Sequence, residues 1–385
     1  MDGCFDLMHF GHFNAIRQVG PSFLPSLLSF LASLTFSVQA RELGDILVAG
    51  IHSDEEIEQN KGPPVMKFAE RLEVLQSCKW VDEVVTGVPY NVSAYMDNII
   101  NKHNCDFIVH GDDPSLNADG TDAYAAIKAA GRFRMIKRTE GISTTELVGR
   151  MLLVTKTHHD PEDSGPHSPT GSGSADGSGP IAMQSAFLAT SRRINQFSNN
   201  LTPAVHDKVV YVNGVWDLFH VGHVRFLKRA RALGTFLIVG IFSDKEANCH
   251  MGSNFPIMNI HERVLSVLAC KYVDEVIIGA PYQVSEGLLK DLNVSVVVKK
   301  PLCDLYYQHE DTEKEEYKVP RDKGILQEVE SRDLLEDEDA ETAIVNTGTI
   351  LQRIIDHRLK YTNRNARRAA KITDYEEKKS YVQEL

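Results

Sequence analysis

The strongest constraint on the fold is an internal repeat that runs through most of the 385 residues. The segment MDGCFDLMHFGH (1–12) aligns with VNGVWDLFHVGH (212–223), and six of the twelve positions are identical. CKWVDEVVTGVPY (78–90) aligns with CKYVDEVIIGAPY (270–282) in the same order along the chain. Because ordered long-range matches arise by tandem duplication, the chain is expected to fold into two units of one type, copy 1 and copy 2.

Each copy alternates short apolar runs with helix-like patterns. The apolar runs include 46–51 and 106–110 in copy 1, and 236–241 and 294–298 in copy 2. Amphipathic segments such as AERLEVLQSC and HERVLSVLAC lie between them. This alternation is typical of parallel strands joined by crossover helices. The predicted fold class is therefore α/β, with two tandem Rossmann-like domains built on parallel sheets.

A linker and a tail complete the predicted organisation. Residues 158–180 have the Gly, Ser and Pro content of a flexible linker, and SAFLATSRRINQF after them is expected to form a short amphipathic helix. From about Arg364 onward we expect a frayed, charged helix. The predicted limits are an N-terminal domain over 1–155, a linker with a short helix over 156–207, a C-terminal domain over 208–360 and a charged tail over 361–385.

Copy 1 carries an insertion that copy 2 lacks. The offset between the copies falls from 211 at His12 to 190 at Gly50, so the 21 residues Val19–Gln39 interrupt the first helix of copy 1. Pro21 and Pro25 prevent this segment from lengthening that helix. The segment is uncharged, but it falls short of a sustained run of about 20 apolar residues, so we do not interpret it as a membrane span.

Copy 1 also differs at its start. Copy 2 opens with KVVYV (208–212), a β-branched run typical of a buried strand. Copy 1 begins at Met1, which aligns with Val212. We therefore expect copy 1 to lack most of its first strand.

Composition limits the classes of partner. The net charge of −12 argues against a general electrostatic hold on nucleic acid or anionic lipid, although a small anionic substrate needs only local positive charge. The six cysteines show no paired metal-type spacing. A reduced, cytoplasmic protein is the expectation.

The repeated motif HxGH reads HFGH at 9–12 and HVGH at 220–223. It is expected to follow a strand and to open a helix, where a helix N-terminus favours an anion. Gly11 would let the backbone approach a phosphate, and His9 and His12 could donate hydrogen bonds to phosphate oxygens. Two incidental histidines, or half of a metal site, are the alternatives. We favour phosphate chemistry because DLxH precedes the motif in both copies.

A family resemblance extends this interpretation. DLMHFGH with RTEGISTTELVGRML (138–152) resembles the cytidylyltransferase branch of the HxGH nucleotidyltransferases, and the tandem layout resembles that of ethanolamine-phosphate cytidylyltransferases. HxGH alone is shared with adenylyltransferases and class I aminoacyl-tRNA synthetases, whereas RTEGISTT is more specific. The resemblance implies transfer of a cytidylyl group from CTP to phosphoethanolamine, giving CDP-ethanolamine and pyrophosphate, in phosphatidylethanolamine biosynthesis.

The resemblance also implies cofactor, partners and location. Mg²⁺ is expected to accompany CTP, and no protein ligand for a metal is assigned. A homodimer is left open, and a cytoplasmic protein with loose association with the endoplasmic reticulum is the implied location. The alternatives to this enzyme are a catalytically impaired scaffold or dimer partner, and a cytidylyltransferase with another phosphomonoester acceptor.

Residue by residue, the resemblance places the working site in copy 1. The implied catalytic residues are His9, His12 and Lys61, the last on the Gly- and Pro-rich loop NKGPPV, where an ammonium could clamp phosphates. The implied CTP-binding residues are Gly3, Cys4, Phe5, Asp6, His9, Gly11, His12, Lys61, His110, Gly111, Asp112, Arg138, Thr139, Ser143, Thr144 and Thr145. Asp6 would help to order the loop.

Structural alternatives stay open at several of these positions. The hydroxyls of 138–145 could cap a helix without binding phosphate, and Asp112 and Asp113 could do the same. Lys61 could be an exposed surface lysine.

Residues outside the motif that recur in both copies are open as well. Arg71 recurs as Arg263, so it could form a structural ion pair and not reach the site. Trp80 and Tyr90 recur as aromatics, and we interpret them as core residues, with substrate contact as the alternative.

Copy 2 keeps the motif but loses its surroundings. Its degenerate site consists of Asp217, His220, Gly222 and His223. Met251 stands where copy 1 has Lys61, KKPLCD replaces HGDD, and Asn346 replaces a serine, although Thr347 is kept. We predict that copy 2 binds CTP weakly or not at all and mainly supports copy 1.

Overall fold

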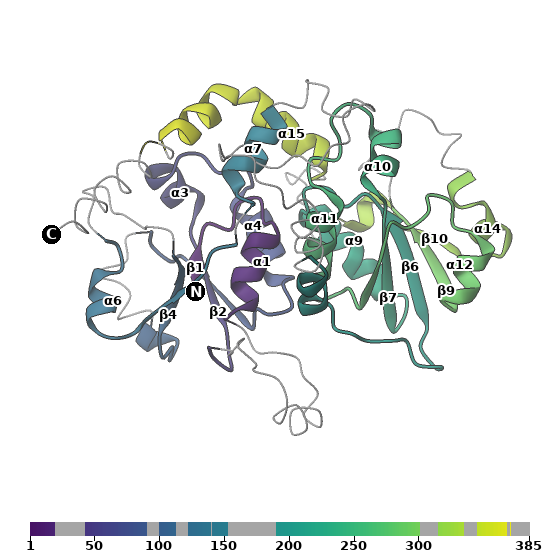
Figure 1. Cartoon of the computed structure of the whole chain (residues 1–385), viewed down its shortest axis with the longest axis horizontal. Coiled ribbons are helices and arrows are strands. Elements are labelled where there is room, and N and C mark those ends of the chain that lie inside the picture. Colours follow the sequence, from purple (N-terminus) through teal and green to yellow (C-terminus); the bar gives the residue numbers. More distant parts are fainter. Residues whose placement is uncertain are drawn as a thin grey trace, which may run out of the picture.

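The computed structural model describes residues 1–19, 43–90, 100–112, 122–139, 141–152, 190–300, 315–334, 345–367 and 370. Copy 1 and copy 2 lie side by side, each with helices packed around parallel strands (Figure 1). Every ladder between the named strands is parallel. The predicted fold class is confirmed.

Copy 2 forms one sheet of five strands in the order β10-β9-β6-β7-β8. The strands are β6 (Val209–Gly214), β7 (Phe236–Ile241), β8 (Glu275–Ile278), β9 (Val294–Lys299) and β10 (Leu326–Glu328). The helices are α9 (Val221–Arg231), α10 (Asp244–Met251), α11 (Ile260–Leu268), α12 (Glu286–Asp291), α14 (Lys318–Asp322), the 3-10 helix η2 (Ser331–Leu334) and α15 (Thr347–Asp356). β6 and β7 are continuous apolar runs because helices cover both faces of a parallel sheet.

Copy 1 repeats this plan in two smaller sheets, β1-β2-β3 and β4-β5. The strands are β1 (Asp2–Gly3), β2 (Val48–Ile51), β3 (Glu83–Thr86), β4 (Ile108–Gly111) and β5 (Phe133–Ile136). The helices are α1 (Phe10–Arg17), α3 (Asp54–Asn60), α4 (Phe68–Gln76), α6 (Ala125–Ala129) and α7 (Thr144–Leu152).

The division of the copy 1 sheet follows from the length of β1. In copy 2, β6 pairs with β9 through Val209, Val210 and Tyr211. These residues align with positions before Met1, so β1 offers two residues, and both pair with β2. Within the described ranges, no ladder joins β1 to β4.

The predicted insertion begins where the first helix ends. α1 stops at Arg17, whereas α9 continues to Arg231. Residues 20–39 of the insertion lie outside the described residues, as does the predicted linker 158–180. Of the short helix expected after the linker, residues 190–197 are described and are helical. Phe197 at its end packs edge-on against Trp80, with ring centroids 5.0 Å apart, and Trp80 is a core residue as expected.

The copies meet across an approximate twofold axis. Cys78 and Cys270, which are repeat equivalents, form an antiparallel bridge. The amide of Lys79 donates to Ala269 at 3.0 Å, and the amide of Lys271 donates to the equivalent carbonyl of copy 1 at 2.8 Å. One continuous core crosses this interface, so the two copies form a single body.

Two equivalent ion pairs flank the axis. Arg150 of α7 pairs with Glu262 at 2.8 Å, and Arg353 of α15 pairs with Glu70 at 2.7 Å. Each arginine also donates to a carbonyl of the other copy, Arg150 to Ile257 and Arg353 to Val65. Helices α7 and α15 therefore each hold a loop of the other copy through one arginine.

The chain continues beyond α15 across the top of copy 1. Residues 358–367 are helical, and the yellow end of the chain lies over α3 in Figure 1. Arg364, where the frayed helix is expected to begin, is 11% exposed and contacts copy 1, and the expectation for the residues after 367 stays a prediction. Residues 371–385 lie outside the described residues.

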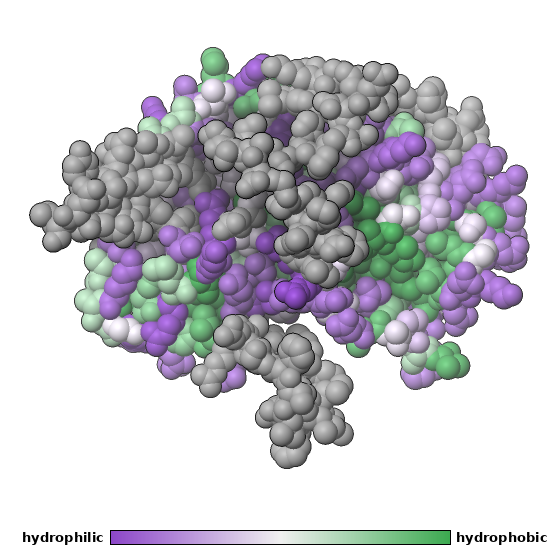
Figure 2. Space-filling view, viewed as in Figure 1, coloured by the Kyte–Doolittle hydropathy of each residue, from purple (hydrophilic) through white to green (hydrophobic). Residues whose placement is uncertain are grey.

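The described surface is mainly hydrophilic along its outer edges, and an apolar area lies over copy 2 (Figure 2). Large exposed apolar side chains are scattered through the chain, as Ile46, Val205 and Leu359 are. Among the described helices, none has the length and apolar character to cross a membrane.

Candidate active site

The HFGH histidines are fixed by the backbone of the helix that they open. His9 is the N-cap of α1, and its Nδ1 accepts a hydrogen bond from the amide of Gly11 at 3.1 Å. Nδ1 of His12 accepts from the amide of His9 at 3.4 Å. The ring centroids lie 4.1 Å apart. The two imidazoles therefore form a reciprocal cap, with the histidines in the places usually taken by Ser and Glu.

This cap determines the tautomer. Because Nδ1 of each ring accepts a hydrogen bond, the neutral imidazole carries its proton on Nε2. The Nε2–H groups of His9 and His12 are thus donors beside a helix N-terminus, where a negative charge is stabilised. In copy 2, His220 and His223 make the same two bonds at 3.2 and 3.4 Å.

The glycine between the histidines is required by packing. A Cβ on Gly11 would lie 2.8 Å from Cε1 of His9 and 3.0 Å from Cγ2 of Ile142. A Cβ on Gly222 would lie 2.4 Å from the carbonyl oxygen of Val345. Close approach to a phosphate, the reason expected for Gly11, stays a prediction. The motif needs glycine in any case, because the loop before α7 or α15 covers that position.

Asp6 joins the HFGH loop to the loop that carries Lys61. Its buried carboxylate accepts from the amides of Val65 at 3.1 Å and Met66 at 2.9 Å. Burial raises the pKa of Asp6, and the two amides and nearby arginines oppose that shift. The expected ordering role of Asp6 is confirmed by this geometry.

The residues between Gly3 and the motif adopt unusual backbone conformations. Phe5 and Leu7 have φ values of +50° and +46°, and their counterparts Trp216 and Leu218 have +60° and +48°. Each such residue costs about 1–3 kcal/mol, so the surrounding contacts must hold the loop in place. Phe5 is buried, and its ring lies 3.3 Å from the Cβ position of Gly3.

Arg71 is one of these contacts. It is 1% exposed, pairs with Asp54 at 2.7 Å and donates to the carbonyl of Cys4 at 2.5 Å. Arg263 makes the equivalent bonds in copy 2. Of the two interpretations left open for Arg71, the structural ion pair is confirmed.

The RTEGISTT loop packs against the HFGH loop. The Thr144 hydroxyl donates to the carbonyl of Asp6 at 3.0 Å, as Thr347 does to Asp217 at 3.2 Å in copy 2. Ser143 accepts from an amide of α7 and thereby caps that helix. These hydroxyls therefore hold the site together whether or not they bind phosphate.

Other predicted residues also meet at this edge. The Thr139 hydroxyl accepts from Asn14 of α1 at 2.9 Å. The amide of Arg138 donates to Asp112 at 2.9 Å, so the RTEGISTT loop is tied to the end of β4. Residues 113–121, which a cap at Asp112 would concern, lie outside the described residues. Thr145 is half-buried. Asp113 lies outside the described residues.

Lys61 and His110 approach the site from two further elements. Lys61 is the C-cap of α3, and its ammonium lies 5.6 Å from the ring centroid of Tyr90. Tyr90 is half-buried, so it belongs to this site more than to the core in which we expected it. His110, followed by Gly111 at the end of β4, packs its ring 4.9 Å from that of Tyr124.

Three residues of the site were not predicted from the sequence. The Tyr124 hydroxyl donates to both carboxylate oxygens of Asp2, at 3.0 and 3.1 Å. His52 lies 3.9 Å from the same carboxylate, and burial lowers the pKa of His52. The sequence held one signal for these residues. Asp2 in β1 and His52 after β2 are ionisable, whereas copy 2 has Asn213 and Phe242 at the equivalent positions.

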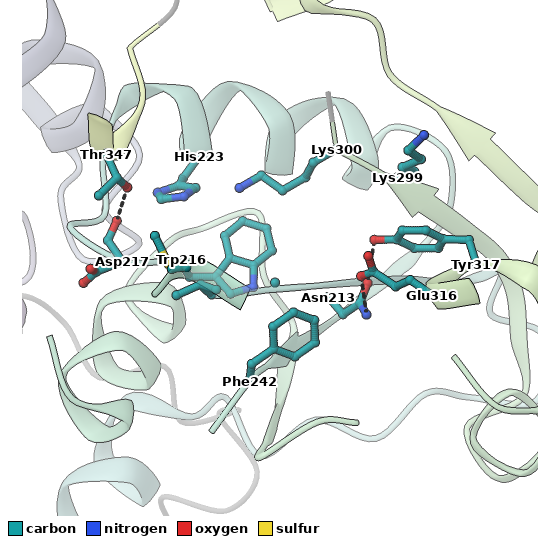
Figure 3. A pocket seen from close by; sticks show the side chains of 13 residues that line it. Asn213, Trp216, Asp217, His223, Phe242, Lys299, Lys300, Glu316, Tyr317 and Thr347 are labelled. Carbon is teal, nitrogen blue, oxygen red and sulfur yellow. Dashed lines mark hydrogen bonds between the residues drawn. The ribbon is translucent and has the colours of Figure 1, made fainter. Parts of the chain in front are cut away.

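Copy 2 encloses a pocket at the equivalent place (Figure 3). His223 and Met251 both line it, and their counterparts in copy 1 are His12 and Lys61. Lys61 is exposed, as the alternative interpretation of this residue expected. Asn213 and Tyr317, the counterparts of Asp2 and Tyr124, line it too. The counterparts of some predicted and some unpredicted residues of copy 1 thus line one pocket in copy 2, although His220, the counterpart of His9, is not among its lining residues.

A lysine side chain enters the copy 2 pocket. Lys300 stands where copy 1 has Gly111, and its ammonium lies 4.4 Å from the ring centroid of Trp216. It extends over the indole toward His223 (Figure 3). Burial, His220 and Lys300 lower the pKa of His223 well below its usual value. In copy 2 a lysine therefore lies on the pocket wall beside a neutral imidazole.

No metal centre is built into the described part of the chain. No three His, Cys, Asp or Glu side chains there are placed to hold an ion. The described residues thus give no protein cage for Mg²⁺.

Known proteins with similar sequences are cytidylyltransferases, which agrees with the phosphate chemistry inferred for the HFGH motif. A sequence model of the family described as Cytidylyltransferase-like matches residues 31–150 and 211–341. The ethanolamine-phosphate cytidylyltransferase of Dictyostelium discoideum is 47% identical and covers 97% of this chain and 95% of its own. Those of Arabidopsis thaliana and Mus musculus are 43% and 41% identical, covering 99% and 96% of this chain and 86% and 88% of their own. The chain belongs to the family of ethanolamine-phosphate cytidylyltransferases.

Proposed function

We propose that this chain transfers the cytidylyl group of CTP to phosphoethanolamine, releasing pyrophosphate, as a step in phosphatidylethanolamine biosynthesis. The relatives that match nearly the whole chain carry that activity in their names. The structural observation behind the proposal is the reciprocal cap of His9 and His12, which directs two Nε2–H donors to a helix N-terminus. Donors preset in this way stabilise charge as it develops on a triphosphate.

The reaction needs no covalent intermediate with the protein. A phosphate oxygen of phosphoethanolamine attacks the α-phosphorus of CTP, and the bond from that phosphorus to the bridging oxygen of pyrophosphate breaks. His9 and His12 donate to the oxygens that gain negative charge, and Lys61 compensates the charge of the leaving pyrophosphate. Catalysis then rests on position and electrostatics.

The Asp2 cluster supports an acceptor that carries an ammonium group. The Asp2 carboxylate is 7% exposed, and its counterpart Asn213 lines the pocket of copy 2. Burial keeps His52 uncharged near neutral pH, so the imidazole does not cancel the negative charge of Asp2. A buried carboxylate beside a tyrosine hydroxyl is well suited to a primary ammonium.

Copy 2 supports copy 1 and does not turn over substrate. Lys300 occupies part of its pocket, and Met251 has replaced the lysine of the clamp. We also propose that Mg²⁺ arrives with the triphosphate, that the protein is cytoplasmic with loose association with the endoplasmic reticulum, and that it forms homodimers.

The decisive assay is CTP-dependent formation of CDP-ethanolamine and pyrophosphate by the purified chain. The same chain without residues 19–39 is the matched variant, because the deletion restores the spacing of copy 2. We expect activity in both, with phosphocholine a poor acceptor. Inactivity of both, with CTP still protecting the protein against thermal unfolding, would favour the impaired scaffold that the divided copy 1 sheet suggests.

A further inference from the structure

The loop that carries Lys61 contains few groups that could hold it in place. It reads KGPPV over 61–65, and its two prolines have no amide hydrogen to donate. Gly62 has a φ of +100°. At one end the amide of Lys61 donates to Ile57 at 2.8 Å, and at the other Asp6 holds Val65. The carbonyls between these ends need donors from elsewhere.

The last described segment of copy 2 supplies these donors. Arg364 donates to the carbonyl of Pro63 at 2.8 Å, and the Tyr361 hydroxyl donates to that of Pro64 at 3.1 Å. Arg353 donates to the next carbonyl, that of Val65, at 3.3 Å. Three successive carbonyls of copy 1 are thus bound by three side chains that lie within twelve residues of copy 2.

Arg364 also contacts the HFGH loop directly. One of its guanidinium nitrogens lies 3.5 Å from the carboxylate of Asp6, and the two side chains are 11% and 7% exposed. A Cβ on Gly62 would lie 3.2 Å from Cγ of Arg364, so the glycine leaves room for the arginine to cross. Asn365 donates to the carbonyl of Thr145 at 3.4 Å, on the RTEGISTT loop. The segment therefore contacts all three loops of the site.

Copy 2 holds its own equivalent loop by different means. There Asn248 of α10 donates to the carbonyls of Ser253 at 2.9 Å and Phe255 at 2.7 Å. The position equivalent to Asn248 in copy 1 is Glu58, whose carboxylate cannot donate. Copy 1 lacks this internal donor and has the arginine and the tyrosine from copy 2 in its place.

We propose that Tyr361, Arg364 and Asn365, on the helical segment that follows α15, complete the active site of copy 1, with Arg364 and Tyr361 as positioning residues for the Lys61 loop. The inference rests on the proposed function for its kinetic consequence, although the contacts stand without it. It gives this late part of the chain a specific task, because the segment that holds the Lys61 loop continues from copy 2.

The test compares Arg364→Ala with Arg358→Ala, an exposed arginine on the same helical segment. We expect Arg364→Ala to raise KM for CTP about tenfold and to change KM for phosphoethanolamine much less, since the Lys61 loop faces the triphosphate. Tyr361→Phe should give a smaller change in the same direction. Arg364→Lys, which keeps the charge, should recover part of the loss. Arg358→Ala should match the unaltered chain.

Amide hydrogen exchange provides a readout that is independent of the reaction. In Arg364→Ala the amides of Val65 and Met66 should exchange faster, whereas those of Ile257 and Met258 in copy 2 should not. Equal kinetics and exchange for the two arginine variants would overturn the proposal, as would faster exchange throughout both copies. If the unaltered chain makes no CDP-ethanolamine, the proposed function fails, and the exchange at Val65 and Met66 still decides this inference.

Discussion

The two copies share a framework and differ in what the framework holds. Asp6 and Asp217 each bind two amides of the following loop, and Arg71 and Arg263 each bind the loop before the motif. These bonds hold residues with positive φ, so losing them would destabilise either copy whether or not it is catalytic.

The differences are concentrated on the walls of the pocket. Copy 1 has a glycine where Lys300 enters the copy 2 pocket, and a lysine where copy 2 has Met251. The buried carboxylate also has a different origin in each copy. Copy 1 has Asp2 in its first strand, whereas copy 2 has Asn213 there and carries Glu316 before the equivalent tyrosine, where copy 1 has Ala123. The two copies thus differ in a few side chains of the pocket while their loops keep the same shape.

The largest expected effect separates the two histidine pairs. His9→Ala with His12→Ala should lower kcat by at least about 10²–10³-fold, because each imidazole supplies a preset donor. His220→Ala with His223→Ala should leave most of the turnover, provided that circular dichroism shows a folded protein. Loss of turnover in the second double variant would show that copy 2 takes part in the chemistry.

The next comparison uses the equivalent arginines of the interface. Arg353→Ala and Arg150→Ala each leave a nearly buried glutamate without its ion pair, which should cost about 3 kcal/mol of unfolding free energy in urea. Only Arg353→Ala should also raise KM for CTP, because Arg353 holds the Lys61 loop through Val65. Equal kinetic effects of the two substitutions would contradict a one-sided dependence of copy 1 on copy 2.

A third comparison concerns the Asp2 cluster. Asp2→Asn gives copy 1 the amide that copy 2 carries, and it should raise KM for phosphoethanolamine about tenfold or more, since a charged partner is lost. Tyr124→Phe keeps the carboxylate and should have a smaller effect. Steady-state kinetics with each substrate varied in turn will show whether KM for CTP stays constant. A rise confined to CTP would remove Asp2 from the acceptor site.

The smallest expected effect is a dependence of stability on pH. Burial holds the pKa of His223 well below 6.5, so the unfolded chain binds a proton there that the folded chain does not. Stability from this group is therefore lost as the pH falls below 6.5, by about 1 kcal/mol at pH 5.5. Urea unfolding at pH 6.5 and at pH 5.5 should show that the unfolding free energy falls less in His223→Asn than in the unaltered chain. An equal loss in both proteins would exclude His223 as the source.

Much of the candidate site could be predicted because it is local and repeated. HxGH at the start of a helix, Asp6 three residues before it and the RTEGISTT hydroxyls lie in short segments that align with copy 2, and the structure brings them together. The ion pair of Arg71 was among the sequence interpretations, but its bonds to the carbonyls of Cys4 and His52 were not, because no side-chain pattern reports a backbone partner.

The Asp2 cluster and the helical segment after α15 could not be predicted. Tyr124 lies 122 residues from Asp2, and Arg364 lies 301 residues from Pro63, so neither contact has a local pattern. A charged stretch near the end of a chain is usually solvated, so nothing in the sequence indicated that Arg364 contacts another domain. Arg364 in this stretch donates to the carbonyl of Pro63 and pairs with the carboxylate of Asp6, both in copy 1.

By itself the sequence determined the duplication, the parallel α/β fold of each copy and the phosphate chemistry of the motif, because periodicity, repeats and short motifs are properties of neighbouring residues. The tertiary structure decided which side chains line the pocket of copy 2 and what holds the loops of each copy. Those outcomes depend on packing two similar domains across the axis through Cys78 and Cys270, which places Lys300 in one pocket and Arg364 against the other.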